Sequence, residues 1–188
     1  MKKTVALFLM AIAYTATIFL SSCTGLIHPA CYAYVGALLP FLSSMIYLNT
    51  CSIRQGFGAA TILNGFLLTV LLLAGEADIA LIIGLAVLTA LSEVIRHFTG
   101  YHTLKGVRRS FLPFAFSFFA YTAHWWTDTE GSLAAAVEEM REGYDQLMIP
   151  VINNIPMLVV VLALTVPVAL WAMRLAERTL KKPAAVLK

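Results

Sequence analysis

Six long apolar stretches, nearly free of charged residues, alternate with short polar segments along the chain. They cover residues 4–22, 28–48, 59–74, 79–95, 111–126 and 149–173. A bilayer core about 30 Å thick is crossed by roughly 20 mostly apolar residues in an α-helix. The pattern therefore predicts an all-α integral membrane protein, with six transmembrane helices in one domain, residues 1–188. Kinks are expected at Pro40, Pro113, Pro156 and Pro167, which lie within or near the stretches.

The composition agrees with a membrane protein, because 60% of the 188 residues are apolar and only 12% are charged. A soluble domain carries about 25% charged residues. The net charge of +3 is too small for a basic nucleic-acid-binding face, so no nucleic-acid partner is expected. Cys23, Cys31 and Cys51 form no CxxC pair and no metal-ligand spacing, so neither a disulfide framework nor a metal site is predicted.

The charged residues predict the orientation, because positive residues concentrate on the cytoplasmic side of membrane proteins. With the N-terminus inside, the inner side holds Lys2, Lys3, Arg54, Arg96, Lys105, Arg108, Arg109, Arg174, Arg178, Lys181, Lys182 and Lys188. The outer side holds Glu76, Asp78, Asp128, Glu130, Glu138, Glu139, Glu142 and Asp145, with Arg141 as its one basic residue. This division predicts that both termini are cytoplasmic.

The N-terminal residues allow one alternative. Lys2, Lys3, the apolar run and the sequence Leu-Ser-Ser-Cys at 20–23 are similar to a lipoprotein signal, in which Cys23 would be lipidated. Cleavage there would leave five helices and an outer N-terminus, with the remaining charge asymmetry unchanged. Against it, the next apolar stretch begins so close to Cys23 that no tether and no soluble domain would follow.

The outer segment before the sixth stretch predicts an amphipathic helix over residues 132–148. Its apolar residues recur at spacings of 4, 3, 4 and 3, and they are Leu133, Val137, Met140, Tyr144 and Leu147. The opposite face is charged. Such a helix is either an ordinary solvated connector or a lid over a binding site in the bundle.

Residues that suit ligand binding gather on the predicted outer face. They are His28, Tyr32, Tyr121, His124, Trp125, Asp128, Asn153 and Asn154. Each has a structural alternative: Trp125 suits an interfacial anchor, the histidines suit ordinary interfacial hydrogen bonds, and Asn153 and Asn154 suit helix capping.

Catalytic motifs are absent from the sequence, which has no HExxH, no GxSxG and no Walker lysine loop. A non-enzymatic role is therefore favoured. Glu93 is the only acid near the membrane interior, and Arg96 and His97 are expected to pair with it at i+3 and i+4. Because the chain has neither an ATP site nor a buried proton relay, any pumping would draw its energy from a partner.

Several local features carry a resemblance to a known family. They are His28-Pro29 opening the second stretch with Pro40 beyond it, Gly100-Tyr101 and Lys105 at the inner turn, the acidic outer segment, and the basic tail at 174–182. In these features, and in length and helix count, the chain resembles the MptD-type (Trep_Strep) family of substrate-binding (S) components of energy-coupling factor (ECF) transporters.

That resemblance implies a function, a set of partners and a location in the bacterial cytoplasmic membrane. An S component captures a micronutrient outside the cell and associates with a transmembrane coupling protein and two cytoplasmic ATPases, which hydrolyse the ATP. The first helix would dock on the coupling protein, and here the small residues Ala11 with Thr15, and Ala13 with Thr17, are the candidates. Contact with a neighbouring helix of the same chain is the alternative for these four. Ala-xxx-Ala, frequent in S components, does not occur in this stretch.

The ligand is expected to be small, flat and conjugated, because the outer face is rich in aromatic residues and has two histidines. A vitamin-like heterocycle or a tetrapyrrole fits this description. Two other functions remain open. One is a membrane-embedded lipid- or isoprenoid-modifying enzyme with His124 and Asp128 as acid and base. The other is a non-catalytic regulatory or assembly subunit that binds a cytoplasmic partner through residues 96–109.

Overall fold

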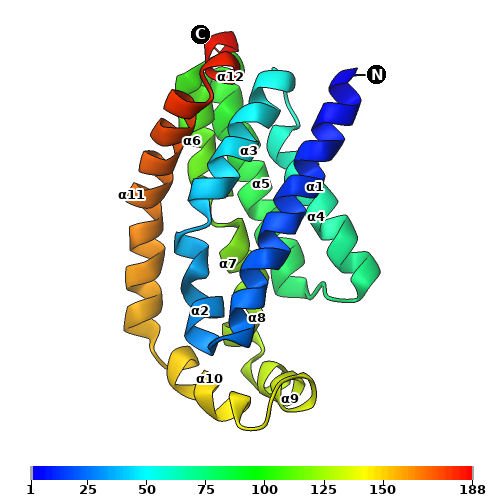
Figure 1. The fold of residues 1–188 in the computed structure, drawn as a ribbon, viewed down its shortest axis with the longest axis vertical. Helices are drawn as coiled ribbons and strands as arrows, with labels where there is room; N and C mark the ends of the chain where they lie inside the picture. Colours follow the sequence, from blue (N-terminus) through cyan, green and yellow to red (C-terminus); the bar gives the residue numbers. More distant parts are fainter. Residues whose placement is uncertain (1, 188) are drawn as a thin grey trace.

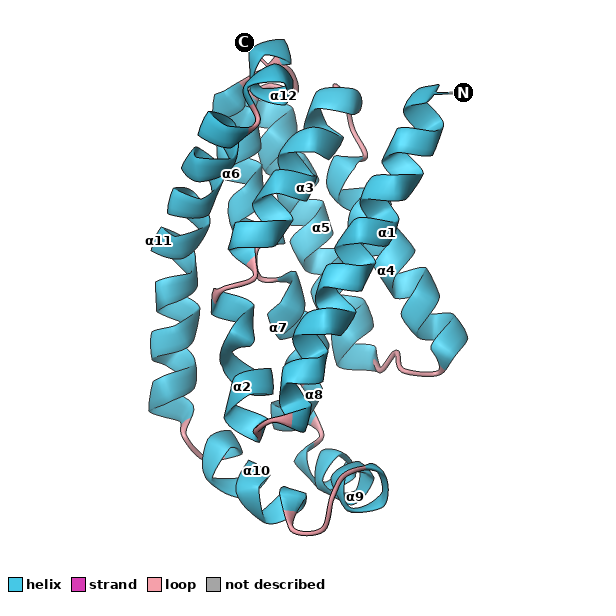
Figure 2. Ribbon diagram, viewed as in Figure 1, coloured by secondary structure: helices cyan, strands magenta, loops and turns pink. Residues whose placement is uncertain are grey.

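Helices form all the regular structure in the computed structural model, which describes residues 2–187 (Figures 1 and 2). In chain order the elements are α1 (Lys2–Ser22), the short 3-10 helix η1 (Cys23–Leu26), α2 (Pro29–Tyr34), η2 (Val35–Ala37), α3 (Pro40–Ile53), α4 (Ala59–Ala74), α5 (Ile79–Thr99), α6 (Leu104–Phe114), α7 (Ser117–Thr122), α8 (His124–Thr127), α9 (Thr129–Glu139), α10 (Tyr144–Ile152), α11 (Ile155–Thr179) and α12 (Lys181–Val186). The predicted all-α class is confirmed.

Among residues 2–187, three helices are each long and apolar enough to cross a bilayer. They are the continuous run Lys2–Leu26, α5 and α11. A fourth span results if Pro29–Ala37 and Pro40–Ile53, which are bent by 43°, are counted as one crossing. Helix α4 is apolar but shorter. The structure thus supports three to four spans by length and composition.

Three of the predicted stretches are broken into shorter helices, and one of them, 149–173, is divided between α10 and α11. Stretch 28–48 bends before Pro40, which stands in the first turn of α3. Stretch 111–126 is divided among α6, α7 and α8, and the first break follows Pro113. Proline has no N–H for the helical ladder and suits the first turn of a helix, which accounts for the break before Pro40. Pro167, by contrast, lies inside α11, which continues to Thr179.

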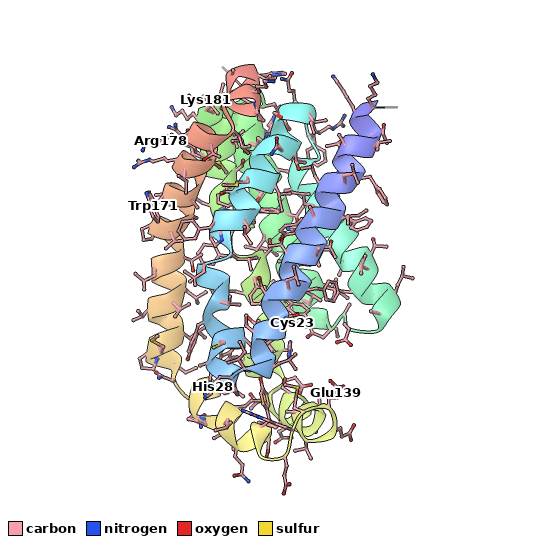
Figure 3. The ribbon with its side chains drawn as sticks, in the orientation of Figure 1. Cys23, His28, Glu139, Trp171, Arg178 and Lys181 are labelled. Carbon is pink, nitrogen blue, oxygen red and sulfur yellow. The ribbon has the colours of Figure 1, made fainter. Side chains whose placement is uncertain are left out.

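The two ends of the bundle differ in charge. Figure 3 shows Arg178 and Lys181 at the end that holds α12 and the start of α1, and His28 and Glu139 at the opposite end. Helices α9 and α10 lie across that opposite end (Figure 1). We refer to these as the basic end and the acidic end.

The predicted docking residues of α1 divide into two pairs. Ala11 and Thr15 are 1% and 6% exposed and belong to the face of α1 that packs on α3 and α4. They contact the chain's own helices, which is the alternative interpretation of this pair. Ala13 and Thr17 are partly exposed, and the Thr17 hydroxyl donates to the Ala13 carbonyl at 2.8 Å.

A buried polar network joins four helices in the apolar core. The Tyr14 hydroxyl donates to Asn64 Oδ1 at 3.0 Å. The Asn64 amide then donates to Thr89 Oγ1 at 2.9 Å and to Ser117 Oγ at 3.1 Å. Because each polar atom named here has a partner, the network fixes the packing of α1, α4, α5 and α7.

Glu93 and Arg96 do not pair with each other, contrary to the sequence prediction, and among the described residues no ion pair joins Glu93 to Arg96 or His97. Buried Glu93 accepts hydrogen bonds from the backbone N–H groups of Gly58, Ala60 and Thr61 at 2.8–3.3 Å. It thereby caps the N-terminus of α4.

Arg96 binds backbone groups at the C-terminal end of α3, just before the connection from α3 to α4. Its Nη2 donates to the carbonyl oxygens of Cys51, Arg54 and Tyr101 at 3.0–3.2 Å. A carboxylate at a helix N-terminus and a cation at a helix C-terminus both match the helix dipole. Competition from these backbone groups explains why the expected side-chain pair does not form.

Candidate functional site

A cavity of about 570 Å³ opens at the acidic end, between the ends of the long helices and the segment α8–α10. Its walls come from the η1 region, α2, the α4–α5 connection, α7–α8, α9 and α10. The lining residues are Ser22, Cys23, Gly25, Leu26, Tyr32, Gly75, Glu76, Ala77, Asp78, Tyr121, His124, Trp125, Asp128, Gly131, Ser132, Ala135, Ala136, Glu139, Met140, Tyr144 and Met148. The volume is within the range of small-molecule sites.

Five of the eight predicted binding residues line this cavity: Tyr32, Tyr121, His124, Trp125 and Asp128. They come from segments about 90 residues apart in the sequence.

The other three predicted residues, His28, Asn153 and Asn154, lie outside the cavity. Exposed His28 caps α2, since its Nδ1 accepts from the Ala30 N–H at 3.1 Å. Asn154 caps α11 by accepting from the Met157 N–H at 3.1 Å, and Asn153 is exposed beside it. For His28 and Asn154 the structural alternative is therefore the one observed.

Tyr32 is the centre of the cavity's aromatic wall. Its ring centroid lies 4.8 Å from that of Trp125, 6.2 Å from Tyr121 and 6.4 Å from His124. Phe118 supports it from the main core at 6.1 Å. These rings offer a rigid apolar surface of a kind that stacks against flat ligands.

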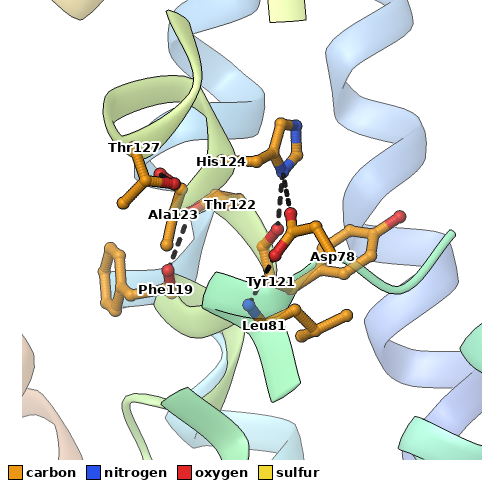
Figure 4. A network of polar contacts seen from close by, with 8 residues as sticks. All are labelled: Asp78, Leu81, Phe119, Tyr121, Thr122, Ala123, His124 and Thr127. Atoms are coloured by element: carbon orange, nitrogen blue, oxygen red, sulfur yellow. Dashed lines mark hydrogen bonds and ion pairs between the residues drawn. The ribbon is translucent and has the colours of Figure 1, made fainter. Parts of the chain in front are cut away.

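His124 has a defined orientation (Figure 4). Its Nδ1 lies 3.0 Å from the Tyr121 carbonyl oxygen and 3.9 Å from Asp78 Oδ2. Because a carbonyl oxygen only accepts, the hydrogen bond assigns the proton to Nδ1. In the neutral ring, Nε2 is then left as an acceptor.

His124 pairs with Asp78 and not with Asp128, the acid predicted to act with it. The structure pairs the ring with Asp78, whereas Asp128 uses its Oδ1 to cap α9 by accepting from the Gly131 N–H at 3.1 Å. Asp78 also caps α5, through Leu81 N at 2.6 Å. The expected acid–base pair of His124 and Asp128 is thus replaced by His124 and Asp78.

The cavity's cover consists of two helices, not the predicted single helix over residues 132–148. Helix α9 ends at Glu139 and α10 begins at Tyr144, and between them Gly143 has a φ of 78°. This left-handed conformation interrupts a helix and is readily adopted only by glycine. Val137, predicted on the apolar stripe, is 66% exposed.

The cover is held by its own small apolar cluster and by long-range hydrogen bonds. Trp125, Ala136, Tyr144 and Met148 are buried together in this cluster, which is separate from the main core. The Tyr144 hydroxyl donates to the Gly25 carbonyl at 2.8 Å, and burial raises the pKa of this hydroxyl. The group therefore stays a protonated donor at neutral pH and ties α10 to η1.

Sequence reasoning missed several residues of the cavity, among them Ser22, Cys23, Glu139 and Met148. Ser22 and Cys23 follow the first apolar stretch directly, so their place at its outer end was a usable signal. Glu139 gave no such signal in the sequence, because its place in the cavity wall depends on how α9 crosses the cavity.

Comparison with protein families identifies the family of this chain. A family model described as hypothetical bacterial integral membrane protein (Trep_Strep) matches residues 1–183. The chain belongs to the Trep_Strep family. Its membership agrees with the apolar helices described above and makes it a bacterial integral membrane protein. No curated protein and no solved structure matches it.

Proposed function

We propose that this protein is the substrate-binding (S) component of an ECF-type ABC importer in the bacterial cytoplasmic membrane. In this proposal it captures a micronutrient, either a vitamin-like heterocycle or a tetrapyrrole, on the outer face. Its partners are an ECF transmembrane coupling protein and two cytoplasmic ATPases, which hydrolyse the ATP. The chain crosses the membrane six times, with α4 and the α6–α7 segment as the shorter crossings, and both termini are cytoplasmic.

The observation that carries the proposal is the cavity of about 570 Å³ at the acidic end. It has an aromatic wall, several polar and acidic side chains and a two-helix cover, which suit the capture of a small molecule. The basic end carries Arg178 and Lys181 and would face the cytoplasm, because positive residues favour that side (Figure 3). A site at one end and cations at the other is the arrangement an importer subunit needs.

The transport proposal is tested by native mass spectrometry of the protein coexpressed with its genomic neighbours and purified in detergent. We expect a complex with a coupling protein and two ATPases, and a small-molecule adduct on the isolated subunit. His124→Ala should reduce the adduct at least about tenfold, because it removes an acceptor from the cavity wall. His28→Ala is the matched control and should retain the adduct, since His28 lies outside the cavity.

Two outcomes would contradict the proposal. One is a protein that purifies without any coupling protein or ATPase. The other is equal retention of the adduct by both histidine variants. A complex with a different cytoplasmic partner and no adduct would favour the regulatory alternative, and a chemically altered lipid would favour the enzyme.

The orientation is tested by cysteine labelling in intact cells. Cys23 is exposed at the acidic end, whereas Cys51 is buried. A membrane-impermeant maleimide should label a variant that keeps Cys23 alone, and one with Glu138→Cys alone, without permeabilisation. Lys105→Cys, in a background without other cysteines, should react only after permeabilisation. The reverse labelling pattern would place the cavity on the cytoplasmic side and would contradict capture of a ligand from outside.

A further inference from the structure

The charged side chains that line the cavity are all acidic, although Arg141 lies near the lining residue Tyr144. Its lining includes the carboxylates of Glu76, Asp78, Asp128 and Glu139, which come from the α4–α5 connection and from α9. No lysine or arginine is among the lining residues in the described part of the chain. Carboxylates that share a concave site focus a negative potential inside it.

Of these four carboxylates, those of Glu76 and Glu139 are free to contact a ligand. Asp78 and Asp128 each use one oxygen to cap a helix. Glu76 and Glu139 are exposed, and no residue in the described range 2–187 donates a hydrogen bond to either side chain. They approach the cavity from different segments, so a ligand seated between them would have an anion on more than one side.

The aromatic wall adds a second and independent preference. The faces of Tyr and Trp rings attract flat rings by stacking and attract cations through their quadrupole. Tyr32 packs against both Trp125 and Tyr121, so its surroundings provide several such faces close together. His124 Nε2, when the ring is neutral, accepts a hydrogen bond from an N–H group.

We infer that the ligand of this cavity is an organic cation: a flat aromatic ring that carries a protonated amine or a quaternary nitrogen. This inference rests on the proposed function and narrows its ligand class. The ring stacks at Tyr32 and Trp125, and the positive nitrogen lies toward Glu76 and Glu139. A tetrapyrrole with ionised carboxylate side chains is excluded by repulsion from the same groups.

The inference is tested with three probes that share the indole ring and differ in charge. Tryptamine is a cation, tryptophol is neutral and indole-3-acetate is an anion at pH 7. In equilibrium dialysis with the purified full-length protein, tryptamine should bind at least about tenfold more tightly than tryptophol, and indole-3-acetate should bind most weakly. The double variant Glu76→Gln, Glu139→Gln should lose most of the preference for tryptamine and keep its affinity for tryptophol.

The matched control is the double variant Glu138→Gln, Glu142→Gln. It removes the same charge from the outer segment, but at residues that do not line the cavity. It should keep the tryptamine preference within about twofold, because exposed charges at a distance are screened by salt. Elution of each variant as a single species in size-exclusion chromatography establishes that it is folded.

Three results would overturn the inference: indole-3-acetate binding as tightly as tryptamine, none of the probes binding, or the control losing the preference as fully as the cavity variant. The transport proposal fails by a different measurement. A tryptamine preference in a protein that never assembles with a coupling protein and ATPases would refute transport alone. Assembly with the coupling protein and ATPases, combined with a preference for indole-3-acetate, would refute only the inference that the ligand is an organic cation.

Discussion

Glu93→Ala is expected to lower the free energy of unfolding by about 3 kcal/mol or more. The variant leaves the N–H groups of Gly58, Ala60 and Thr61 without their acceptor at the start of α4. It also leaves Arg96, which is fully buried, without the nearby negative charge one turn before it. In a thermal unfolding scan in detergent, this loss corresponds to a decrease in Tm of about 6–12 °C.

Glu177→Ala is the matched control for this variant. Glu177 also bridges two helices at the basic end, through its ion pair with Arg108. The Arg108 side chain is 45% exposed, so the pair is worth about 1 kcal/mol or less. Equal decreases in Tm for the two variants would show that Glu93 does not act as the cap of α4.

Gly106→Ala is expected to destabilise the protein by about 3 kcal/mol, the upper part of the range for overpacking. A Cβ atom at this position would overlap the backbone carbonyl oxygen of Gly100 and would lie 3.0 Å from Thr103 Oγ1. The turn has little freedom to move away, since Thr103 Oγ1 accepts from the Gly106 N–H at 2.9 Å and Gly100 has a φ of 100°. Thermal unfolding in detergent measures the effect.

Gly65→Ala provides the comparison. Gly65 lies inside α4, and an added Cβ there meets nothing within 4 Å. Because alanine favours a helix over glycine by about 1 kcal/mol, this variant should be as stable as the original protein or slightly more so. If Gly106→Ala unfolds at the same temperature as Gly65→Ala, the close approach between α5 and α6 at this turn is not tight.

The sequence predicted the features that depend on composition and local chemistry. The apolar runs became helices and the bend came at Pro40, while Asn154 caps α11, which was the alternative to its predicted role in ligand binding. The cluster of aromatic residues near His124 was also predictable, because the second apolar run was expected to begin, and the fifth to end, at the same end of the bundle.

The features that depend on competition between partners were not predictable. Glu93 and Arg96 stand at ideal spacing for an ion pair, yet each binds backbone groups of helices that are distant in sequence. His124 meets Asp78 across the cavity, not Asp128 four residues on. Similarly, the apolar stripe over 132–148 continued through Gly143, whose left-handed conformation breaks the helix. The spacing of residues in the sequence could not reveal which tertiary contacts form.

The separation of the two apolar clusters has a consequence for how a ligand enters. The buried residues that hold α9 and α10 share no member with the main core, which lies among the long helices. Segments with few buried contacts open locally at a lower free energy than the whole protein unfolds. If the proposed ligand passes beneath α9 and α10, its entry is controlled by this second cluster, whose members Ala33 and Trp125 lie on α2 and α8, and not by the side chains that pack the long helices together.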